Sequence, residues 1–295
     1  MIPGVRLVRK EAGESSFDVV RRFKDRARQD GEPKLALGHG GTLDPFAEGL
    51  LLVLAGQATR LMELLHPLPK TYEADIAWGE ETDTCDHLGL PVATGPGPDP
   101  ARLDGALAAF LGWADQVPPA TSAKKIGGEA AYKKAHRGEE VVLPPSRVFL
   151  HEARWLAHDL PRRSTLRITC KGGFYVRSLA RDLGRALGSP AHLCRLHRTA
   201  IGPWADPGPG GEVLVTGKAA LPWCPARELT GEELDHLLHG RPIPLGAVEA
   251  PAWPFPAGFP DPGAPVAAHH EGRLMALLRE RDGAFWTSAN LRGGL

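Results

Sequence analysis

The chain has 295 residues, of which 42% are hydrophobic and 24% charged, and Lys+Arg and Asp+Glu are balanced at 35 each. This composition predicts a folded, soluble protein with a sizeable core, built as one large domain or as a catalytic domain with a small appendage. No apolar run approaches the roughly 20 residues of a membrane-spanning helix, and the N-terminus lacks the pattern of a secretory signal. We therefore expect a cytoplasmic protein.

The cysteines and the charge distribution further limit the kinds of site and partner that we expect. Cys85, Cys170, Cys194 and Cys224 form neither a CxxC pair nor a Cys/His ligand pattern, so we expect neither a zinc site nor a disulfide framework. Between residues 161 and 198, basic residues stand against the single acid Asp182. Such a stretch is able to neutralise several phosphates, although a solvated helix face would give the same pattern.

The first elements in chain order are a short strand and a surface helix. Residues 5–8 (VRLV) form an apolar strand, and Ser15 or Ser16 can cap a helix that follows. Residues 49–56 (GLLLVLAG) are continuously apolar, which is typical of a buried strand or a buried helix. Residues 71–79 (TYEADIAWG) alternate as a half-buried strand, with one face formed by Tyr72, Ala74, Ile76 and Trp78.

The middle of the chain contains a polar excursion and a basic helix. Residues 101–112 predict a short amphipathic helix, and residues 118–141 are polar, basic and interrupted by glycine. Residues 165–170 predict a strand, and residues 176–188 follow helical spacing. On that helix a stripe recurs at every fourth residue, made of Arg177, Arg181 and Arg185, and it suits a phosphate backbone.

Glycine and proline dominate residues 202–211, which we interpret as a linker to a second, C-terminal domain. In that domain, residues 229–240 predict a capped helix. Residues 272–286 predict two strands around an Asp-Gly turn.

The motif GHGGTLDPFAEG, residues 38–49, contains one acidic side chain suited to chemistry, Asp44. Taken alone, an aspartate in a glycine-rich turn is more often a turn residue than a catalyst. Further segments stand in order behind it: GQATR at 56–60, KTYEADIAWGEETDTCDHLG at 70–89, QVPPATSAKKIGGEAAYKKAHRG at 116–138, and CKGGFYVRSLARDLGRALGSPAHLCRLHRT at 170–199. Together they resemble the bacterial tRNA pseudouridine-55 synthases of the TruB type, from about residue 5 to residue 202.

The resemblance implies a fold and a domain division. It implies an α/β (α+β) pseudouridine synthase domain over residues 1–205 with a mixed, largely antiparallel central sheet. Residues 121–147 would be an RNA-contacting insertion, and residues 212–295 a small C-terminal domain that is PUA-like or a simple packing module. The implied activity is the isomerisation of uridine 55 in the T-loop of tRNA by a monomer that needs no metal and no cofactor.

The resemblance also assigns roles to individual residues. Asp44 would be the nucleophile that attacks C6 of the base or C1′ of the sugar, Arg177 its cationic partner through two hydrogen bonds, and Tyr72 the stacking residue of the pocket and an acceptor for the C5 proton. Tyr175 and Leu196 would contact the flipped base, and His39 would hold the RNA loop open. The remaining substrate contacts would be Gly41, Lys125 and Arg181.

Three departures from the family pattern affect RNA contacts. Arg9, Lys10 and Glu11 stand where the family usually has Asp-Lys-Pro, Thr121 stands in place of a tyrosine, and His136 in place of an arginine. None of them touches the proposed nucleophile.

Rival hypotheses belong to other classes. A non-catalytic RNA-binding protein would use the same basic surface, with Asp44 as a turn residue. A phosphate-binding hydrolase lacks the GxxxxGK[ST] pattern it would need. A metal enzyme built on Asp83 and Asp86 is also conceivable, but we expect these carboxylates to organise a loop.

Overall fold

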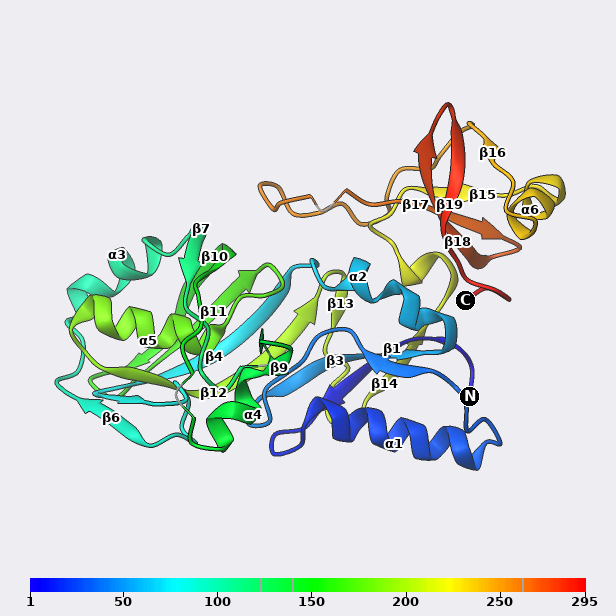
Figure 1. The fold of residues 1–295 in the computed structure, drawn as a ribbon. Helices are drawn as coiled ribbons and strands as arrows, with labels where there is room; N and C mark the ends of the chain where they lie inside the picture. The colour runs from blue at the N-terminus through cyan, green and yellow to red at the C-terminus, as the bar shows by residue number, and fades with distance from the viewer. Residues whose placement is uncertain (123, 140, 262) are drawn as a thin grey trace. The chain divides into compact units, whose positions relative to one another are not determined.

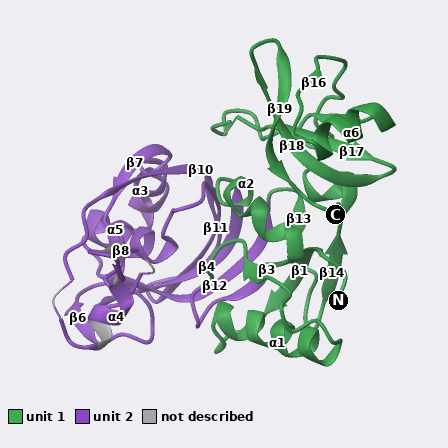
Figure 2. Ribbon diagram, turned by 45° about the vertical axis from the view of Figure 1, so that its right-hand side comes forward, with its two compact units in different colours: residues 1–43, 50–67, 202–295 green, residues 44–49, 68–201 purple. Residues whose placement is uncertain are grey.

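The computed structural model describes residues 1–122, 124–139, 141–261 and 263–295. The chain divides into two compact units, shown in different colours in Figure 2. The first unit contains residues 1–43, 50–67 and 202–295, and the second contains residues 44–49 and 68–201. Asp44 is therefore the first residue of the second unit.

Helices and strands are interspersed along the whole described chain (Figure 1). The helices are α1 (Ser16–Gln29), α2 (Met62–Leu65), α3 (Leu103–Ala108), α4 (Ala131–His136), α5 (Val176–Leu187) and α6 (Gly231–Leu238), with 3₁₀ turns η1 (Gly56–Leu61), η2 (Pro100–Arg102) and η3 (Gly217–Ala220). The strands are β1 (Gly4–Lys10), β2 (Leu37–His39), β3 (Glu48–Ala55), β4 (Lys70–Trp78), β5 (Glu80–Thr82), β6 (Pro91–Thr94), β7 (Gly112–Gln116), β8 (Lys125–Ile126), β9 (Glu129–Ala130), β10 (Ser146–Asp159), β11 (Arg163–Cys170), β12 (Ala191–Ile201), β13 (Trp204–Ala205), β14 (Glu212–Val215), β15 (Ala226–Glu228), β16 (Ile243–Pro244), β17 (Val266–His270), β18 (Arg273–Arg281) and β19 (Ala284–Asn290). Among the helices within the described ranges, none is long and apolar enough to span a bilayer.

In the first unit, β1 lies between β14 and β3, and β2 pairs with β3. The predicted helix α1 begins after Ser15, whose side chain accepts a hydrogen bond from the Asp18 backbone N–H while the Asp18 carboxylate accepts one from the Ser15 backbone. One apolar side of α1 packs on the strands in a buried cluster formed by Val8, Val19, Phe23, Leu51 and Val53. The apolar run 49–56, left open between strand and helix, is the strand β3.

In the second unit, the strand order is β12-β4-β11-β10-β7. These neighbours are antiparallel, whereas the start of β3 pairs in parallel with β12, Glu48 facing His197 and Gly49 facing Arg198. The predicted mixed, largely antiparallel sheet is therefore confirmed. The predicted face of β4 is buried, with Tyr72, Ala74, Ile76 and Trp78 each at most 7% exposed.

The C-terminal residues form a separate sheet in the order β15-β17-β18-β19-β16. Two expected features are present: the Thr230 capping box at the start of α6, and the β18–β19 hairpin, where Asp282 and Gly283 have φ of 53° and 72°. β14, which follows the proline- and glycine-rich segment 202–211, pairs with β1 and therefore does not belong to the separate sheet. That sheet begins later, at Ala226 of β15. The PUA-like character of this part stays a prediction.

We expect Gly49→Ala to destabilise the second unit, because Gly49 stands where its β3 backbone meets β12. Gly49 has φ of +109°, and a Cβ there would lie 2.3 Å from the Arg198 carbonyl oxygen. Strained backbone together with a contact that cannot relax costs about 2 kcal/mol or more of the free energy of unfolding. Denaturant titration of purified protein measures this loss.

Gly105→Ala is the matched control for Gly49→Ala. Gly105 lies in the short helix α3, and a Cβ there meets nothing within 4 Å. We expect this change to stabilise the protein by about 0.5–1 kcal/mol. Equal effects of the two substitutions would contradict the close contact at Gly49.

His269 predicts a pH dependence of the C-terminal sheet. Its ring is 1% exposed, and neither ring nitrogen has a hydrogen-bond partner within the described residues. Burial lowers the pKa of His269, helped by the charge of Lys218 and opposed by the charge of Glu228, a contact with the Ala267 backbone and the charge of Glu249. Above pH of about 6.5 the ring is neutral in the folded and the unfolded chain, and below it only the unfolded chain takes up the proton. The free energy of unfolding should therefore fall as the pH drops below about 6.5.

The test is urea unfolding between neutral and acidic pH. His269→Leu should flatten the decline and raise stability at neutral pH by about 1 kcal/mol, since it removes a buried polar group without partners. His239→Ala, at an exposed position on the end of α6, is the control and should leave the slope unchanged. An identical pH profile for His269→Leu and the original protein would show that His269 does not limit acid stability.

Candidate active site

Asp44 lies in a turn that leads into β3. The Asp44 carbonyl oxygen accepts a hydrogen bond from the Ala47 N–H at 3.1 Å, which closes the turn. The preceding residue, Leu43, is held by the Ser16 hydroxyl, which accepts from the Leu43 N–H at 2.9 Å and donates to the Leu43 carbonyl at 3.1 Å. The backbone on both sides of Asp44 is therefore fixed. Its side chain keeps 30% of its surface exposed.

Arg177, in the first turn of α5, binds the Asp44 carboxylate with both of the predicted hydrogen bonds. Nε donates to one oxygen and Nη2 to the other, each at 2.9 Å. The Arg177 side chain is 4% exposed, so this pair is little screened by water. A planar fork on a carboxylate fixes the orientation of the carboxylate as well as its charge.

The same guanidinium is anchored from three further residues. Nη1 donates to the Thr84 carbonyl at 3.0 Å, to the Thr121 hydroxyl at 2.7 Å and to Asp86 at 3.3 Å. Asp86 also accepts from the Thr84 hydroxyl and the Leu88 N–H, so it organises its loop as expected and contacts Arg177 as well. These contacts leave Arg177 little freedom to turn away from Asp44.

Thr121 and Asp86 are contacts that reasoning from the sequence missed. Thr121 was noted only as a departure from the family pattern, and Asp86 only as a loop residue. The motif TDTCDHLG around Asp86 was the available signal, but no local pattern indicates that its carboxylate faces an arginine in α5.

Tyr175 precedes α5 and is held through its backbone by Gln116 of β7. The Gln116 side-chain oxygen accepts from the Tyr175 N–H at 2.9 Å, and its side-chain nitrogen donates to the Tyr175 carbonyl at 3.0 Å. Burial raises the pKa of the Tyr175 hydroxyl, so the side chain is neutral near pH 7. Gln116, 6% exposed, carried no signal in the sequence.

Tyr72 lies on β4, 7% exposed and directly opposite Arg198 of β12. Burial raises the pKa of Tyr72 to about 12, the positive charge of Arg198 opposes this rise, and the negative charge of Asp44 adds to it. Two residues away on the same strand, burial lowers the pKa of Lys70 to about 7, helped by the charge of Arg198. The phenol is therefore neutral near pH 7 in surroundings that contain two basic groups.

The arginine stripe on α5 is only partly open to solvent, because Arg177 and Arg181 are buried whereas the Arg185 side chain is 62% exposed. Its suitability for a phosphate backbone stays a prediction. Arg181 donates to the Val117 carbonyl and to Asp182. Arg185 donates to both oxygens of Glu81. Helical spacing placed these side chains on one face, but the sequence did not show which acids and carbonyls of other segments pair with them. A substrate contact by Arg181 stays a prediction.

The other predicted site residues lie on different elements. Leu196 is 4% exposed on β12, opposite Ala74. His39 ends β2, and Gly41 follows it with φ of 123°, a conformation that favours glycine. Lys125 belongs to β8 and His136 to α4, but their side chains lie outside the described part of the structure.

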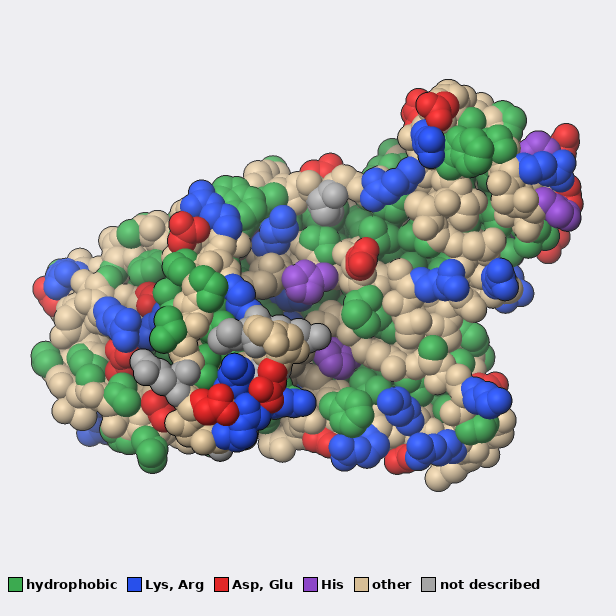
Figure 3. Space-filling model, viewed as in Figure 1, with side chains coloured by type: hydrophobic (Ala, Val, Ile, Leu, Met, Phe, Trp, Pro, Cys, Tyr) green, Lys and Arg blue, Asp and Glu red, His purple; other side chains and the backbone are tan. Residues whose placement is uncertain are grey.

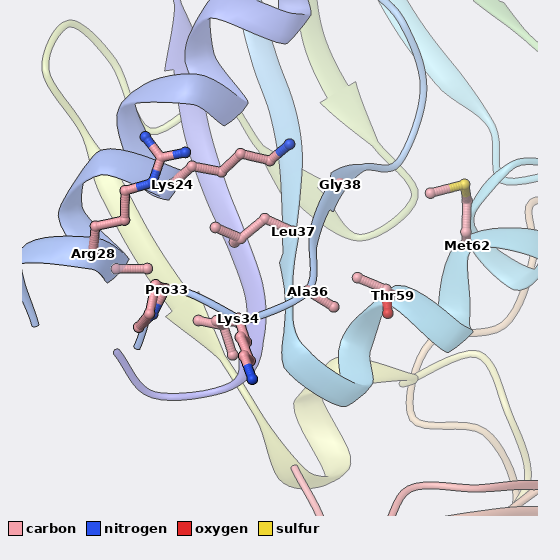
Figure 4. A pocket seen from close by; sticks show the side chains of 11 residues that line it. Lys24, Arg28, Pro33, Lys34, Ala36, Leu37, Gly38, Thr59 and Met62 are labelled. Atoms are coloured by element: carbon pink, nitrogen blue, oxygen red, sulfur yellow. The ribbon is translucent and has the colours of Figure 1, made fainter. Parts of the chain in front are cut away.

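A pocket of about 580 Å³ lies in the first unit (Figure 4). Lys24 and Arg28 extend from α1 on one side of it, and Thr59 and Met62 come from η1 and α2 on the other. Its lining includes Gly38, where the motif begins, but not Asp44, Arg177 or Tyr72. Arg28 pairs with Asp25 at 2.9 Å. The pocket is thus distinct from the Asp44–Arg177 pair.

Solved structures share this fold. The chain aligns with "Structure of H/ACA RNP bound to a substrate RNA containing 2'-deoxyuridine" at a TM-score of 0.68 and 19% identity, covering 98% of this chain and 84% of that one. A second match, "Crystal Structure of a Cbf5-Nop10-Gar1 Complex", has a TM-score of 0.68 and 21% identity over the same shares. At such identities the likeness concerns the fold.

Sequence relatives are more similar. Residues 32–176 match the TruB family pseudouridylate synthase (N terminal domain), a range that contains Asp44 and Tyr72 and ends just before Arg177. A tRNA pseudouridine synthase B of Xanthomonas campestris is 42% identical over 69% of this chain and 65% of its own length. One of Thermobifida fusca is 36% identical over 96% of this chain and 97% of its own length. The chain therefore belongs to the TruB family of pseudouridylate synthases.

Proposed function

We propose that this protein isomerises uridine to pseudouridine in tRNA, at position 55 of the T-loop, with Asp44 as the nucleophile. The observation that carries the proposal is the Asp44–Arg177 pair, in which two hydrogen bonds of 2.9 Å hold a partly exposed carboxylate. Full-length relatives at 36% identity, from Thermobifida fusca and Arthrobacter, are named tRNA pseudouridine synthase B. We also propose that the protein acts as a monomer and needs neither a cofactor nor a metal.

The reaction needs little more than a nucleophile and a shaped pocket. The bond between N1 of the base and C1′ of the ribose breaks, the base turns, and a bond from C5 to C1′ forms. C5 loses its proton and N1 gains one, so atoms and electrons balance without an oxidant or water. Asp44 attacks either C6 of the base or C1′ of the sugar, and both paths use one carboxylate.

Arg177 orients this carboxylate and lies against its charge. A fixed guanidinium compensates part of the hydration that a carboxylate loses when substrate covers it. The guanidinium lies on the carboxylate through two bonds, and Asp86 and Thr121 hold the guanidinium in turn. The arrangement therefore exists before substrate arrives.

The target base must leave its stack to reach Asp44, which costs a few kcal/mol. Tyr72 would stack on the flipped base and would accept the C5 proton once its own hydroxyl proton has passed to N1 or to solvent. Tyr175 would hydrogen-bond to the base, and Leu196 would pack on it. His39 would hold the opened loop beside Gly41, and Lys125 and Arg181 would be further RNA contacts. The T-loop would be recognised through its shape and phosphates, as is usual for structured RNA.

Tritium release from a tRNA transcript labelled at uridine C5, with mapping of the product, tests the proposal. Asp44→Asn should abolish release, because the amide is not a nucleophile, while tRNA binding remains. Arg177→Lys should lower release at least about 100-fold, because one ammonium group cannot hold both carboxylate oxygens. EDTA should leave the rate unchanged.

Thermal unfolding and tRNA binding of each variant serve as controls. Folded, tRNA-binding protein that releases no tritium before any substitution would favour a non-catalytic RNA-binding protein instead. Full activity of Asp44→Asn would remove Asp44 from the mechanism.

A further inference from the structure

Trp113 is a large aromatic side chain that is 46% exposed, on a strand at the end of the second unit's strand order. It lies on β7, which pairs with β10 so that Trp113 stands opposite Phe149. The two ring centroids are 5.1 Å apart, and Phe149 is buried. The two ring planes are tilted by 51°, so Phe149 contacts one side of the indole, and nearly half of the Trp113 surface is open to solvent.

Two cations lie over this ring. The Lys171 ammonium is 5.4 Å from the ring centroid, and the Arg147 guanidinium 5.8 Å. Asp115 lies 3.7 Å from Arg147, a loose pair between exposed side chains. On the face drawn in Figure 3, hydrophobic side chains lie beside Lys and Arg side chains over β7 and β10. We name Trp113, Phe149, Arg147 and Lys171 the Trp113 platform.

The platform continues into a shallow pocket of about 390 Å³. His151 stacks on Phe149 with centroids 6.2 Å apart and also lines this pocket, together with Leu111, two residues before Trp113. Arg154 and Arg167 supply positive charge there, against Glu152 in the lining and Glu73, which lies 3.8 Å from Arg167. Aromatic rings and basic groups therefore form one continuous track on the second unit.

The platform is connected to the active site through two short stretches of backbone. Gln116, which holds Tyr175, is three residues after Trp113 on β7, about 10 Å along the strand. Lys171 is four residues before Tyr175, and its N–H donates to the Phe149 carbonyl at 3.0 Å. Side chains three residues apart on a strand point to opposite faces, so Trp113 is exposed on one face of β7 while Gln116 is buried on the other. A nucleotide on Trp113 would share these backbone segments with Tyr175 and bind on the exposed face of the strand.

We propose that the Trp113 platform binds an unpaired nucleotide of the RNA substrate, whose base stacks on the indole and whose phosphate contacts Lys171 and Arg147. An exposed indole that is held by a neighbouring ring accepts any base by stacking, and the neighbouring cations neutralise the phosphates of the RNA backbone. The inference rests on the proposed function for the identity of the RNA. It adds a contact outside the pocket around Asp44 and names the residues that make it.

Binding of an unmodified tRNA transcript to Trp113→Ala tests this contact. We expect about 10-fold weaker binding, within the range of one lost stacking interaction, while Trp113→Phe keeps most of the affinity. The double variant Arg147→Gln/Lys171→Gln should weaken binding and reduce its dependence on salt concentration. In tritium release, Trp113→Ala should raise KM and leave kcat within about twofold.

Phe17→Ala is the matched control, because Phe17 is also exposed and also carries two cations, Arg21 at 5.3 Å and Lys24 at 5.2 Å, but on α1 of the first unit. It should bind tRNA like the original protein. Unchanged binding of a folded Trp113→Ala variant, or an equal loss for Phe17→Ala, would overturn the platform.

The two proposals fail in different ways. If the original protein releases no tritium but Trp113→Ala still weakens RNA binding, the platform stands and the proposed isomerisation falls. If tritium release requires Asp44 but neither tRNA binding nor KM changes in Trp113→Ala, the proposed isomerisation is supported and the RNA contact of the Trp113 platform is contradicted.

Discussion

The guanidinium of Arg177 is the group on which the site depends. Its nitrogen atoms bind Asp44 from the turn before β3, Thr84 and Asp86 from the loop after β5, and Thr121 from the start of the insertion. One side chain at the start of α5 thus ties together segments that are far apart in the chain. A buried cation that touches two carboxylates is stable only while those partners stay in place, so the same contacts that position Asp44 also hold these loops.

The parts that could be predicted from the sequence have local causes. The capping serine of α1, the alternation of β4 and the spacing of α5 are each determined by residues a few positions apart, and the structure has all three. The Asp44–Arg177 pair is a long-range contact, and only the family resemblance indicated it. The resemblance matched both residues to the family pattern, whereas composition and periodicity do not indicate that Asp44 and Arg177 are in contact.

The parts that could not be predicted depend on what covers a surface. Spacing placed Arg181 and Arg185 on one side of α5, but their partners, the Val117 carbonyl and the Glu81 carboxylate, are distant in sequence. Arg181 is buried while Arg185 stays largely exposed, and spacing does not distinguish the two. Gln116 is a second residue whose role could not be predicted from the sequence. A glutamine in a short polar strand has no distinguishing pattern, and its importance follows from its two hydrogen bonds to the Tyr175 backbone.

The charges around Tyr72 connect the two halves of the proposed reaction. In the free protein, burial and the negative charge of Asp44 both raise the pKa of this tyrosine, to about 12, and Arg198 alone among these three opposes the rise. In the proposed mechanism Asp44 forms a bond to the nucleoside, and its carboxylate would then become a neutral ester. One cause of the raised pKa then disappears while Arg198 remains, so the hydroxyl becomes easier to ionise in the intermediate than in the free protein. Only the ionised phenol can accept a proton, so Tyr72 would have to release its own hydroxyl proton before it takes the one from C5. Loss of the Asp44 charge makes that release easier after attack than before it, which favours proton removal after the base has been engaged.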